Sequence, residues 1–151
     1  MQDVTHAWTV RVRADGPDDA TAHARRHVLR LGAAAGFDAE APLPSAVEAL
    51  LAALGADLLS TFAATARRAR LPHDALEAVL RCTLDNPLVH LGVIGEVGSP
   101  RIAAIDGTLY VSSDAAAPDV ERAWAVTRAR SPLYTTLERS VALTVRLCPT
   151  P

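Results

Sequence analysis

The segment from Ala49 to Ala64 constrains the fold of this chain most, because all but one of its residues are apolar or small. The exception is Asp57, the only charged residue between Glu48 and Arg67. If the segment is helical, one stripe of it consists of Leu50, Leu54, Asp57 and Thr61. A carboxylate on a stripe that should be buried is costly unless it is paired or protonated. Asp57 therefore either anchors a polar network or marks a site.

The composition is that of a globular protein without a charged partner. The chain has 151 residues, half of them hydrophobic, which is enough for one domain with a real core. Its net charge of −2 gives no electrostatic attraction to nucleic acid or to a membrane surface. We expect a single domain over residues 1–151 in the cytoplasm. The N-terminus does not resemble a signal peptide, and no strictly apolar run approaches the roughly 18 residues of a membrane span.

The N-terminal region predicts a β-hairpin followed by a loop. Residues 7–14 alternate between apolar and polar side chains, which is typical of a strand. A turn cluster at 15–19 follows, and a second strand is expected over about 22–31. Residues 32–44 are rich in Gly, Ala and Pro and predict a loop.

A long helix is expected after this loop. Ser45 and Glu48 form a capping box, in which each side chain bonds to the backbone amide of the other residue. The helix should run to about Arg70, and Pro72 should end it. Gly55 in its middle costs about 1 kcal/mol relative to Ala, which indicates close approach of another backbone.

The second half of the chain predicts strands and helices in turn. The expected strands cover 75–85, 101–112 and about 141–147, and the expected helices cover 118–130 and 132–139. In the first of these helices the inner stripe consists of Val120, Ala123, Trp124 and Thr127. Asp106-Gly107 indicates a hairpin turn or a bulge. This order does not alternate as parallel βαβ units do, so we expect an α+β fold with an antiparallel sheet.

Four sequence motifs, taken in order, resemble one family. They are Glu-Ala-Leu-Leu-Ala-Ala-Leu-Gly-Ala-Asp-Leu (48–58), Asp-Asn-Pro (85–87), Leu-Tyr-Val-Ser (109–112) and Ser-Pro-Leu-Tyr-Thr-Thr-Leu (131–137). Over nearly its whole length the chain resembles the OsmC/Ohr family of osmotically inducible and organic hydroperoxide resistance proteins, which are thiol peroxidases of oxidative stress. The resemblance implies an intertwined homodimer, with β-sheet wrapped around long central helices. It also implies reduction of organic hydroperoxides by a pair of cysteines.

The resemblance places those two cysteines at positions where this chain has other residues. The peroxidatic cysteine falls late in the first motif, where the chain has Asp57, and the resolving cysteine precedes Pro132, where it has Ser131. A carboxylate cannot attack a peroxide as a thiolate does, and a serine cannot form the resolving disulfide. We therefore expect the peroxidase cycle to be lost.

The resemblance also implies two charged residues at the site. One is a Glu near the start of the long helix, for which Glu48 is the candidate, shifted by one residue. The other is an Arg from the N-terminal hairpin, for which Arg26 is the first candidate and Arg25 and Arg30 are rivals. Since Glu48 lies nine residues before Asp57, the two fall on opposite faces of a helix.

Each candidate residue also has a structural interpretation. Asp57 could keep the charge of the replaced thiolate and pair with an Arg, or it could be a general base with a raised pKa. Ser131 could be a nucleophile, or it could simply be the N-cap before Pro132. The capping box alone accounts for Glu48.

The remaining reactive side chains predict neither a redox pair nor a metal site. Cys82 falls on the apolar side of its strand, where a free cysteine behaves as a small hydrophobe, and Cys148 lies near the C-terminus. A relocated pair of these two thiols is the alternative. His23 and His27 fall in one expected strand, where a separation of four residues holds them apart. We expect no metal and no cofactor.

Our leading hypothesis is thus an OsmC-like homodimer without peroxidase chemistry, which binds a small apolar ligand at a cleft between subunits. The residues expected near that cleft are Asp57, Trp124, Ser131 and Tyr134. The first alternative is an organic hydroperoxide reductase that uses Cys82 or Cys148. A further alternative is an acid/base or hydrolytic enzyme that uses Asp57 and Ser131.

Overall fold

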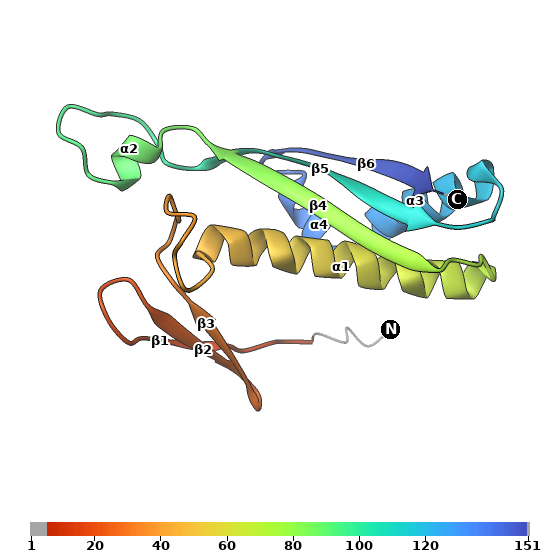
Figure 1. The fold of residues 1–151 in the computed structure, drawn as a ribbon, viewed down its shortest axis with the longest axis horizontal. Helices are drawn as coiled ribbons and strands as arrows, with labels where there is room; N and C mark the ends of the chain where they lie inside the picture. The colour runs from red at the N-terminus through yellow and green to blue at the C-terminus, as the bar shows by residue number, and fades with distance from the viewer. Residues whose placement is uncertain (1–5, 151) are drawn as a thin grey trace. The chain divides into compact units, whose positions relative to one another are not determined.

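The computed structural model describes residues 6–150, which form two compact units that divide between Leu50 and Leu51. The elements, in chain order, are β1 (Arg11–Ala14), β2 (Ala20–Ala24), β3 (His27–Leu31), α1 (Ala46–Ala69), β4 (Ala75–Leu84), α2 (Pro87–His90), β5 (Ile102–Ser112), α3 (Ala117–Arg130), α4 (Pro132–Leu137) and β6 (Ala142–Thr150) (Figure 1). Helix α1 begins in the first unit and continues in the second.

The N-terminal unit contains a three-stranded antiparallel sheet in the order β1-β2-β3. The prediction of one strand over 22–31 is wrong, because a two-residue turn at Arg25 and Arg26 divides it, with Ala24 paired to His27. Arg25 supplies the left-handed conformation of this turn with φ 56°, a conformation that Gly or Asn usually signals in a sequence. Strand β1 is also shorter than predicted, since it begins at Arg11.

The loop after β3 closes back on the start of α1. The amide of Gly32 donates to the carbonyl of Pro44 at 2.9 Å, which joins the two ends of the loop. The amides of Ala46 and Val47 donate to loop carbonyls at 3.1 Å. These two amides lack partners within the helix, so the loop satisfies donors that a helix N-terminus leaves open.

Helix α1 ends in a left-handed residue. Arg70 has φ 54°, its amide donates to the Arg67 carbonyl at 3.2 Å, and the Leu71 amide donates to the Ala66 carbonyl at 2.9 Å. This is a Schellman motif with an Arg at the position that usually holds Gly. The helix therefore stops before Pro72, which was predicted to end it.

By length and composition alone, α1 is the one helix among the described residues that could cross a membrane. Its most apolar window of 18 residues has a mean hydropathy of 1.6, and 33% of that window is buried. The core helix of a soluble protein passes the same test, so this property by itself is weak evidence of a span.

The C-terminal unit contains a mixed sheet in the order β4-β5-β6. Strands β4 and β5 are antiparallel, whereas β5 and β6 are parallel. The α+β class is confirmed, but the prediction of an antiparallel sheet is wrong for β5 and β6, because α3 and α4 carry the chain back across the sheet. Asp106 and Gly107 form neither a turn nor a bulge. They pair with Arg81 and Leu80 inside β5, and the irregularity lies at Thr83/Leu84.

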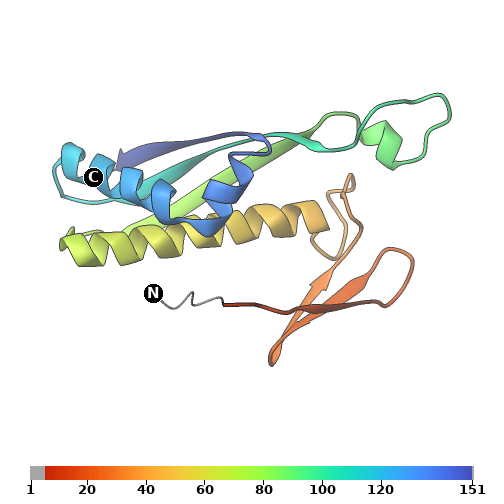
Figure 2. The ribbon, with the colours of Figure 1, turned by 180° about the vertical axis from the view of Figure 1, so that it is seen from behind.

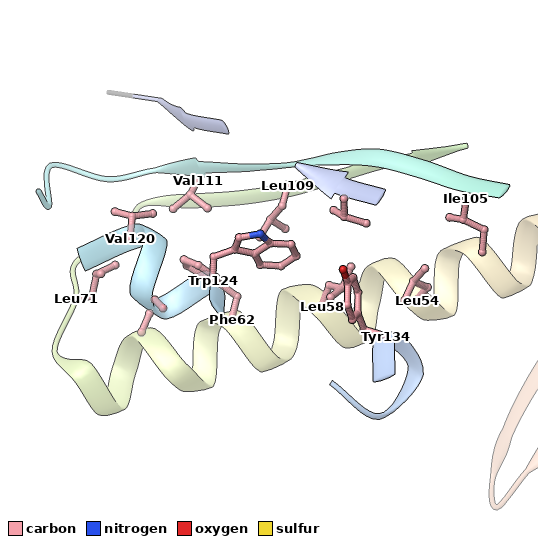
Figure 3. Packing of buried hydrophobic residues seen from close by; sticks show 13 residues of the cluster. Leu54, Leu58, Phe62, Leu71, Ile105, Leu109, Val111, Val120, Trp124 and Tyr134 are labelled. Carbon is pink, nitrogen blue, oxygen red and sulfur yellow. The ribbon is translucent and has the colours of Figure 1, made fainter. Parts of the chain in front are cut away.

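The core lies between this sheet and the helices α1, α3 and α4, which share one face of it (Figure 2). The buried members are Leu54, Leu58, Phe62, Ala66, Leu71, Ile105, Leu109, Val111, Val120, Ala123, Trp124, Tyr134 and Val145. Figure 3 shows Trp124 between the sheet and α1. Along β4 burial alternates residue by residue, as predicted, so the other face of the sheet is exposed. The predicted inner stripe of α3 is buried in full.

Candidate functional site

Asp57 lies at the edge of the buried stripe of α1 and not in its centre. The buried residues of this helix are Leu54, Gly55, Leu58, Phe62, Thr65 and Ala66. Asp57 is half-buried, and so is Thr61 one turn later. The predicted stripe is therefore rotated from the observed one, which lets the carboxylate of Asp57 reach the neighbouring helix α4.

The carboxylate of Asp57 meets Ser131, the other residue that the sequence singled out. The Ser131 hydroxyl donates to Asp57 Oδ2 at 2.5 Å, and the amide of Leu133 donates to the same oxygen at 2.9 Å. The Thr61 hydroxyl donates to Oδ1 at 3.4 Å. The structure thus brings together Asp57 and Ser131, which lie 74 residues apart in the chain.

These contacts cap the N-terminus of α4. Ser131 is its N-cap, and the Ser131 hydroxyl oxygen accepts from the Tyr134 amide at 3.0 Å. The next free amide, that of Leu133, donates to Asp57, and Pro132 has no amide hydrogen to satisfy. Hydrogen bonds from O–H and N–H groups therefore hold the Asp57 carboxylate, and within the described part of the C-terminal unit it has no Arg partner.

Ser131 is poorly placed to act as a nucleophile. The residue is fully buried, so a substrate cannot reach its hydroxyl without opening the core. The Ser131 hydroxyl already donates its hydrogen to the Asp57 carboxylate, and its oxygen accepts a hydrogen bond from the Tyr134 amide. These are the two hydrogen bonds expected of a capping serine. The geometry is that of a helix junction.

The aromatic residues expected at a cleft are packed in the core. Trp124 and Tyr134 are both buried, and their rings meet edge to face with centroids 6.3 Å apart (Figure 3). Arg128 covers the Trp124 ring at 5.7 Å in a cation–π contact. Both side chains are therefore members of the hydrophobic core of this unit.

Glu48 is held by the capping box that the sequence predicts. Its Oε2 accepts from the Ser45 amide at 2.7 Å and from the Ser45 hydroxyl at 2.8 Å, and the Glu48 amide donates to the Ser45 hydroxyl oxygen at 3.2 Å. The Ser45 amide, and then the hydroxyl, hold the pKa of Glu48 below its ordinary value. Its carboxylate is thus committed to the start of α1.

Arg26 lies in the N-terminal unit, at the exposed turn between β2 and β3, with Arg25 beside it. Arg30, the other rival, is on β3 and lies 3.8 Å from Asp19. The prediction that one of these arginines faces Asp57 remains a prediction.

The two cysteines are far apart on opposite faces of one sheet. Cys82 on β4 pairs with buried Ile105, whereas Cys148 on β6 pairs with Tyr110, which is 37% exposed. Paired residues share a face, so the two thiols point in opposite directions. Strand β5 separates them by roughly 10 Å, and five residues of offset add about 16 Å. Disulfide formation requires Cα atoms within about 7 Å. Burial also raises the pKa of the Cys82 thiol.

The two histidines lie on adjacent strands and not on one strand as predicted. His23 is on β2 opposite Val28, and His27 is on β3 opposite Ala24. Since Ala24 follows His23 on the same strand, the two imidazoles face opposite sides of the sheet. No group of three His, Cys, Asp or Glu side chains in residues 6–150 could hold a metal ion.

Sequence reasoning missed the backbone groups of the site. The amides of Leu133 and Tyr134 complete the hydrogen bonding, and Thr61 adds a third donor to the carboxylate. The signal for the Tyr134 amide was present, because an N-cap serine before proline offers its hydroxyl to an amide three residues later. The amide of Leu133 could be assigned to Asp57 only from the tertiary structure.

The fold and the site together define a class of protein. It is a small α+β protein in which a long apolar helix packs under a three-stranded sheet and is joined to a short helix by a hydrogen-bonded polar pair. The chain belongs to the OsmC-like protein family, whose model matches residues 37–146. No curated protein matches the sequence.

Solved structures of this family share the fold at low sequence identity. The OsmC-like protein from Mycoplasma pneumoniae is 17% identical, with a TM-score of 0.78 and 96% of each chain covered. An organic hydroperoxide resistance protein OsmC from Legionella pneumophila is 12% identical, with a TM-score of 0.67, and covers 95% of this chain and 98% of its own. The organic hydroperoxide resistance protein OhrB of Bacillus subtilis is 14% identical, with a TM-score of 0.65 and the same coverage.

Proposed function

We propose that this protein is an OsmC-like homodimer that has lost the thiol peroxidase cycle and binds a small apolar ligand at a cleft between its subunits. The observation that carries the first part is the hydrogen bond between buried Ser131 and half-buried Asp57. At the two positions where the resemblance places the cysteines, the chain has a pair of residues that cap α4. Neither side chain can be oxidised by a peroxide and then regenerated by a disulfide.

The positions of the native thiols support the same conclusion. A two-cysteine cycle requires the oxidised sulfur to meet the second thiol. Cys82 and Cys148 are separated by β5 and face opposite sides of the sheet. In addition, the raised pKa of Cys82 lowers its thiolate fraction at neutral pH, and the thiolate is the species that attacks oxygen.

One observation favours the alternative of an organic hydroperoxide reductase, namely the names of the relatives from Legionella pneumophila and Bacillus subtilis. Both thiols are half-buried, and a single one could still react with a peroxide and be regenerated by an external thiol. The hydrolytic alternative is less favoured, because the Ser131 hydroxyl is buried and donates to a carboxylate and not to an imidazole.

Apolar surfaces in both units support the homodimer and its ligand. Of the residues in strands β1, β2 and β3, only Ala22 is buried, although β1 and β3 carry exposed valine and leucine side chains. Exposed apolar side chains gathered on a small sheet indicate a surface that a partner covers. In the C-terminal unit, α1 and β4 border a groove of about 390 Å³. The side chains that line it are all apolar and belong to Leu51, Ala52, Ala56, Leu59, Ala78 and Leu80, with Gly55 between them.

The peroxidase question is tested by consumption of cumene hydroperoxide with dithiothreitol. We expect the wild type, Cys82→Ser and Cys148→Ser to match the reductant blank. Turnover that disappears in one of the cysteine variants would overturn the proposal and identify the active thiol. Turnover that survives both single changes but not Asp57→Asn would instead indicate acid/base chemistry.

The dimer and its ligand are tested through the groove beside α1. Ala56→Arg places a charge in the groove and should shift the mass measured by light scattering from dimer to monomer, whereas Ala129→Arg on an exposed part of α3 should not. The same change should reduce binding of 1-anilinonaphthalene, an uncharged apolar probe. A monomeric wild type, or probe binding equal in both variants, would contradict this part of the proposal.

A further inference from the structure

A second hollow, separate from the Asp57 junction, lies between the end of α1 and the first half of α3. Its volume is about 330 Å³, at the lower end of the range typical of small-molecule sites. The residues that line it are Thr65, Ala69, Arg70, Leu71, Pro72, Ala115, Asp119, Arg122, Ala123 and Val126. Apolar side chains thus make most of the wall, with a hydroxyl and three charges set into it.

The hydroxyl belongs to Thr65, which is 5% exposed. Its Oγ1 is buried without a hydrogen-bond partner among the described residues. By contrast, the buried hydroxyls of Thr127 and Ser131 are both bonded. An unpaired buried hydroxyl is unfavourable, because it has lost water without gaining a partner. Thr65 therefore indicates a polar partner that comes from outside the chain.

The charges around the hollow leave one cation uncompensated. Asp119 pairs with Arg122 one helical turn away, which cancels both charges. Arg70 has no carboxylate partner in the described part of the chain. The positive end of the α3 dipole and the negative end of the α1 dipole both border the hollow and offset each other. The side chain of Arg70 thus makes the net charge around the hollow positive.

Arg70 also occupies a costly backbone conformation. Its φ of 54° is the left-handed position of the α1 Schellman motif, where Gly is the most stable choice. A glycine there would relieve the strain but would remove the guanidinium from the hollow. The stability of the fold and the charge of the hollow therefore make opposite demands on this residue.

We propose that this hollow binds a small carboxylate with a short apolar chain. A carboxylate accepts hydrogen bonds from both a guanidinium and a hydroxyl, so it suits Arg70 and Thr65 together. The apolar chain would cover Ala69, Ala123 and Val126, and the Arg122–Asp119 pair would border the opening. This site is independent of the peroxidase chemistry and of the groove beside β4.

Isothermal titration calorimetry of the full chain with hexanoate tests the proposal. We expect saturable binding of hexanoate, weaker binding of hexanol and no binding of hexylammonium, because only the carboxylate complements Arg70. Sodium phosphate serves as an anion without an apolar chain and should not compete. Absence of saturable hexanoate binding, or equal binding of hexanol, would overturn the proposal.

Variants at Arg70 separate the site from the fold. Arg70→Gln and Arg67→Gln each remove one charge near the C-terminal end of α1, but of these two residues only Arg70 lines the hollow. We expect the first to weaken hexanoate binding about tenfold, equivalent to one charge-assisted bond, and the second to leave it unchanged. Arg70→Gly should weaken binding by as much while raising the melting temperature. Equal affinity of wild type and both Arg70 variants would refute the role of Arg70.

A variant at Thr65 tests the hydroxyl. Thr65→Val keeps the shape of the side chain and removes the unpaired donor, so the melting temperature should not fall. Hexanoate affinity should drop severalfold if the hydroxyl meets the carboxylate. Unchanged affinity in this variant would show that Thr65 has no part in binding.

Discussion

Asp57 accepts a 2.5 Å hydrogen bond from the hydroxyl of Ser131, and the two residues stand at the positions where the OsmC/Ohr resemblance places a pair of cysteines. The same oxygen of Asp57 accepts the amide of Leu133. In this chain the junction between α1 and α4 therefore caps a helix. Two thiols at these positions could carry redox chemistry, but Asp57 and Ser131 cannot. Its main consequences concern stability, and they can be measured.

Replacing Asp57 should destabilise the protein strongly. Asp57→Ala removes the acceptor of the Ser131 hydroxyl and of the Leu133 amide, which are then left unsatisfied in or near the core. We expect a loss of about 2–4 kcal/mol in the free energy of unfolding. Urea denaturation at neutral pH measures it, with exposed Asp114→Ala as the matched control, expected to change by no more than about 0.5 kcal/mol.

The contribution of the pair itself follows from a double-mutant cycle. Asp57→Ala and Ser131→Ala share one hydrogen bond, so their effects should not add, and we expect a coupling of about 1–3 kcal/mol. Additive losses within about 0.5 kcal/mol would show that the two residues act independently and would contradict a hydrogen-bonded junction of Asp57 and Ser131.

Introducing both cysteines should restore a disulfide at this junction. The side-chain oxygens of Asp57 and Ser131 already touch, so Asp57→Cys together with Ser131→Cys should place two sulfurs within bonding reach after a small movement. Mild oxidation should then lower the free thiols from four, the two native ones plus two introduced, to two. Each single variant should keep three. Peptide mapping identifies the bridge, and four persistent thiols in the double variant would contradict the geometry.

The native cysteines should not form a bridge within one chain. Cys82 and Cys148 lie on the outer strands of the C-terminal sheet and face opposite sides of it. Both should therefore remain as thiols after oxidation of dilute protein. Because burial raises the pKa of Cys82, its reaction with Ellman's reagent at pH 7 should be slower than that of an unhindered thiol. Mass spectrometry under non-reducing conditions would detect the contrary result, an intramolecular disulfide.

Glu48 should make stability depend on pH in the acidic range. Its folded-state pKa lies below its ordinary value of 4.5, so its stabilisation is present above the unfolded pKa and is lost as the pH falls through the folded pKa. The stability difference between wild type and Glu48→Gln should accordingly be larger at roughly pH 6 than at roughly pH 3. Exposed Glu77→Gln is the control for the loss of one negative charge. A difference independent of pH would mean that the capping box does not depend on the carboxylate.

Two glycines should respond oppositely to replacement by alanine. A Cβ on Gly107 would clash with the carbonyl oxygen of Val79 and approach Leu80 Cδ2 to 2.6 Å, so Gly107→Ala should cost about 1–3 kcal/mol. A Cβ on Gly55 would lie 3.6 Å from Leu80 Cδ1, an ordinary contact, so Gly55→Ala should stabilise an isolated subunit by up to about 1 kcal/mol. Thermal unfolding of both variants checks the signs.

The sequence determined the elements whose signals are local. The capping box at Ser45 starts α1, the alternation of β4 matches its burial, and Ser131 caps α4 as its position before Pro132 predicts. These features depend on residues a few positions apart, and hydrogen bonds or periodicity within one element decide them. The resemblance to the OsmC/Ohr family rested on such motifs and was confirmed.

The tertiary structure decided what depends on residues distant in the chain. The left-handed turn at Arg25 split a predicted strand, and the path of α3 and α4 made β6 parallel to β5. The amide partner of Asp57 comes from a segment 76 residues away. Side-chain pattern records which face of an element is buried but not which element covers it, because many distant segments could satisfy the same apolar stripe or the same carboxylate. The sequence alone therefore singled out Asp57 and Ser131, and only packing showed that they bond to each other.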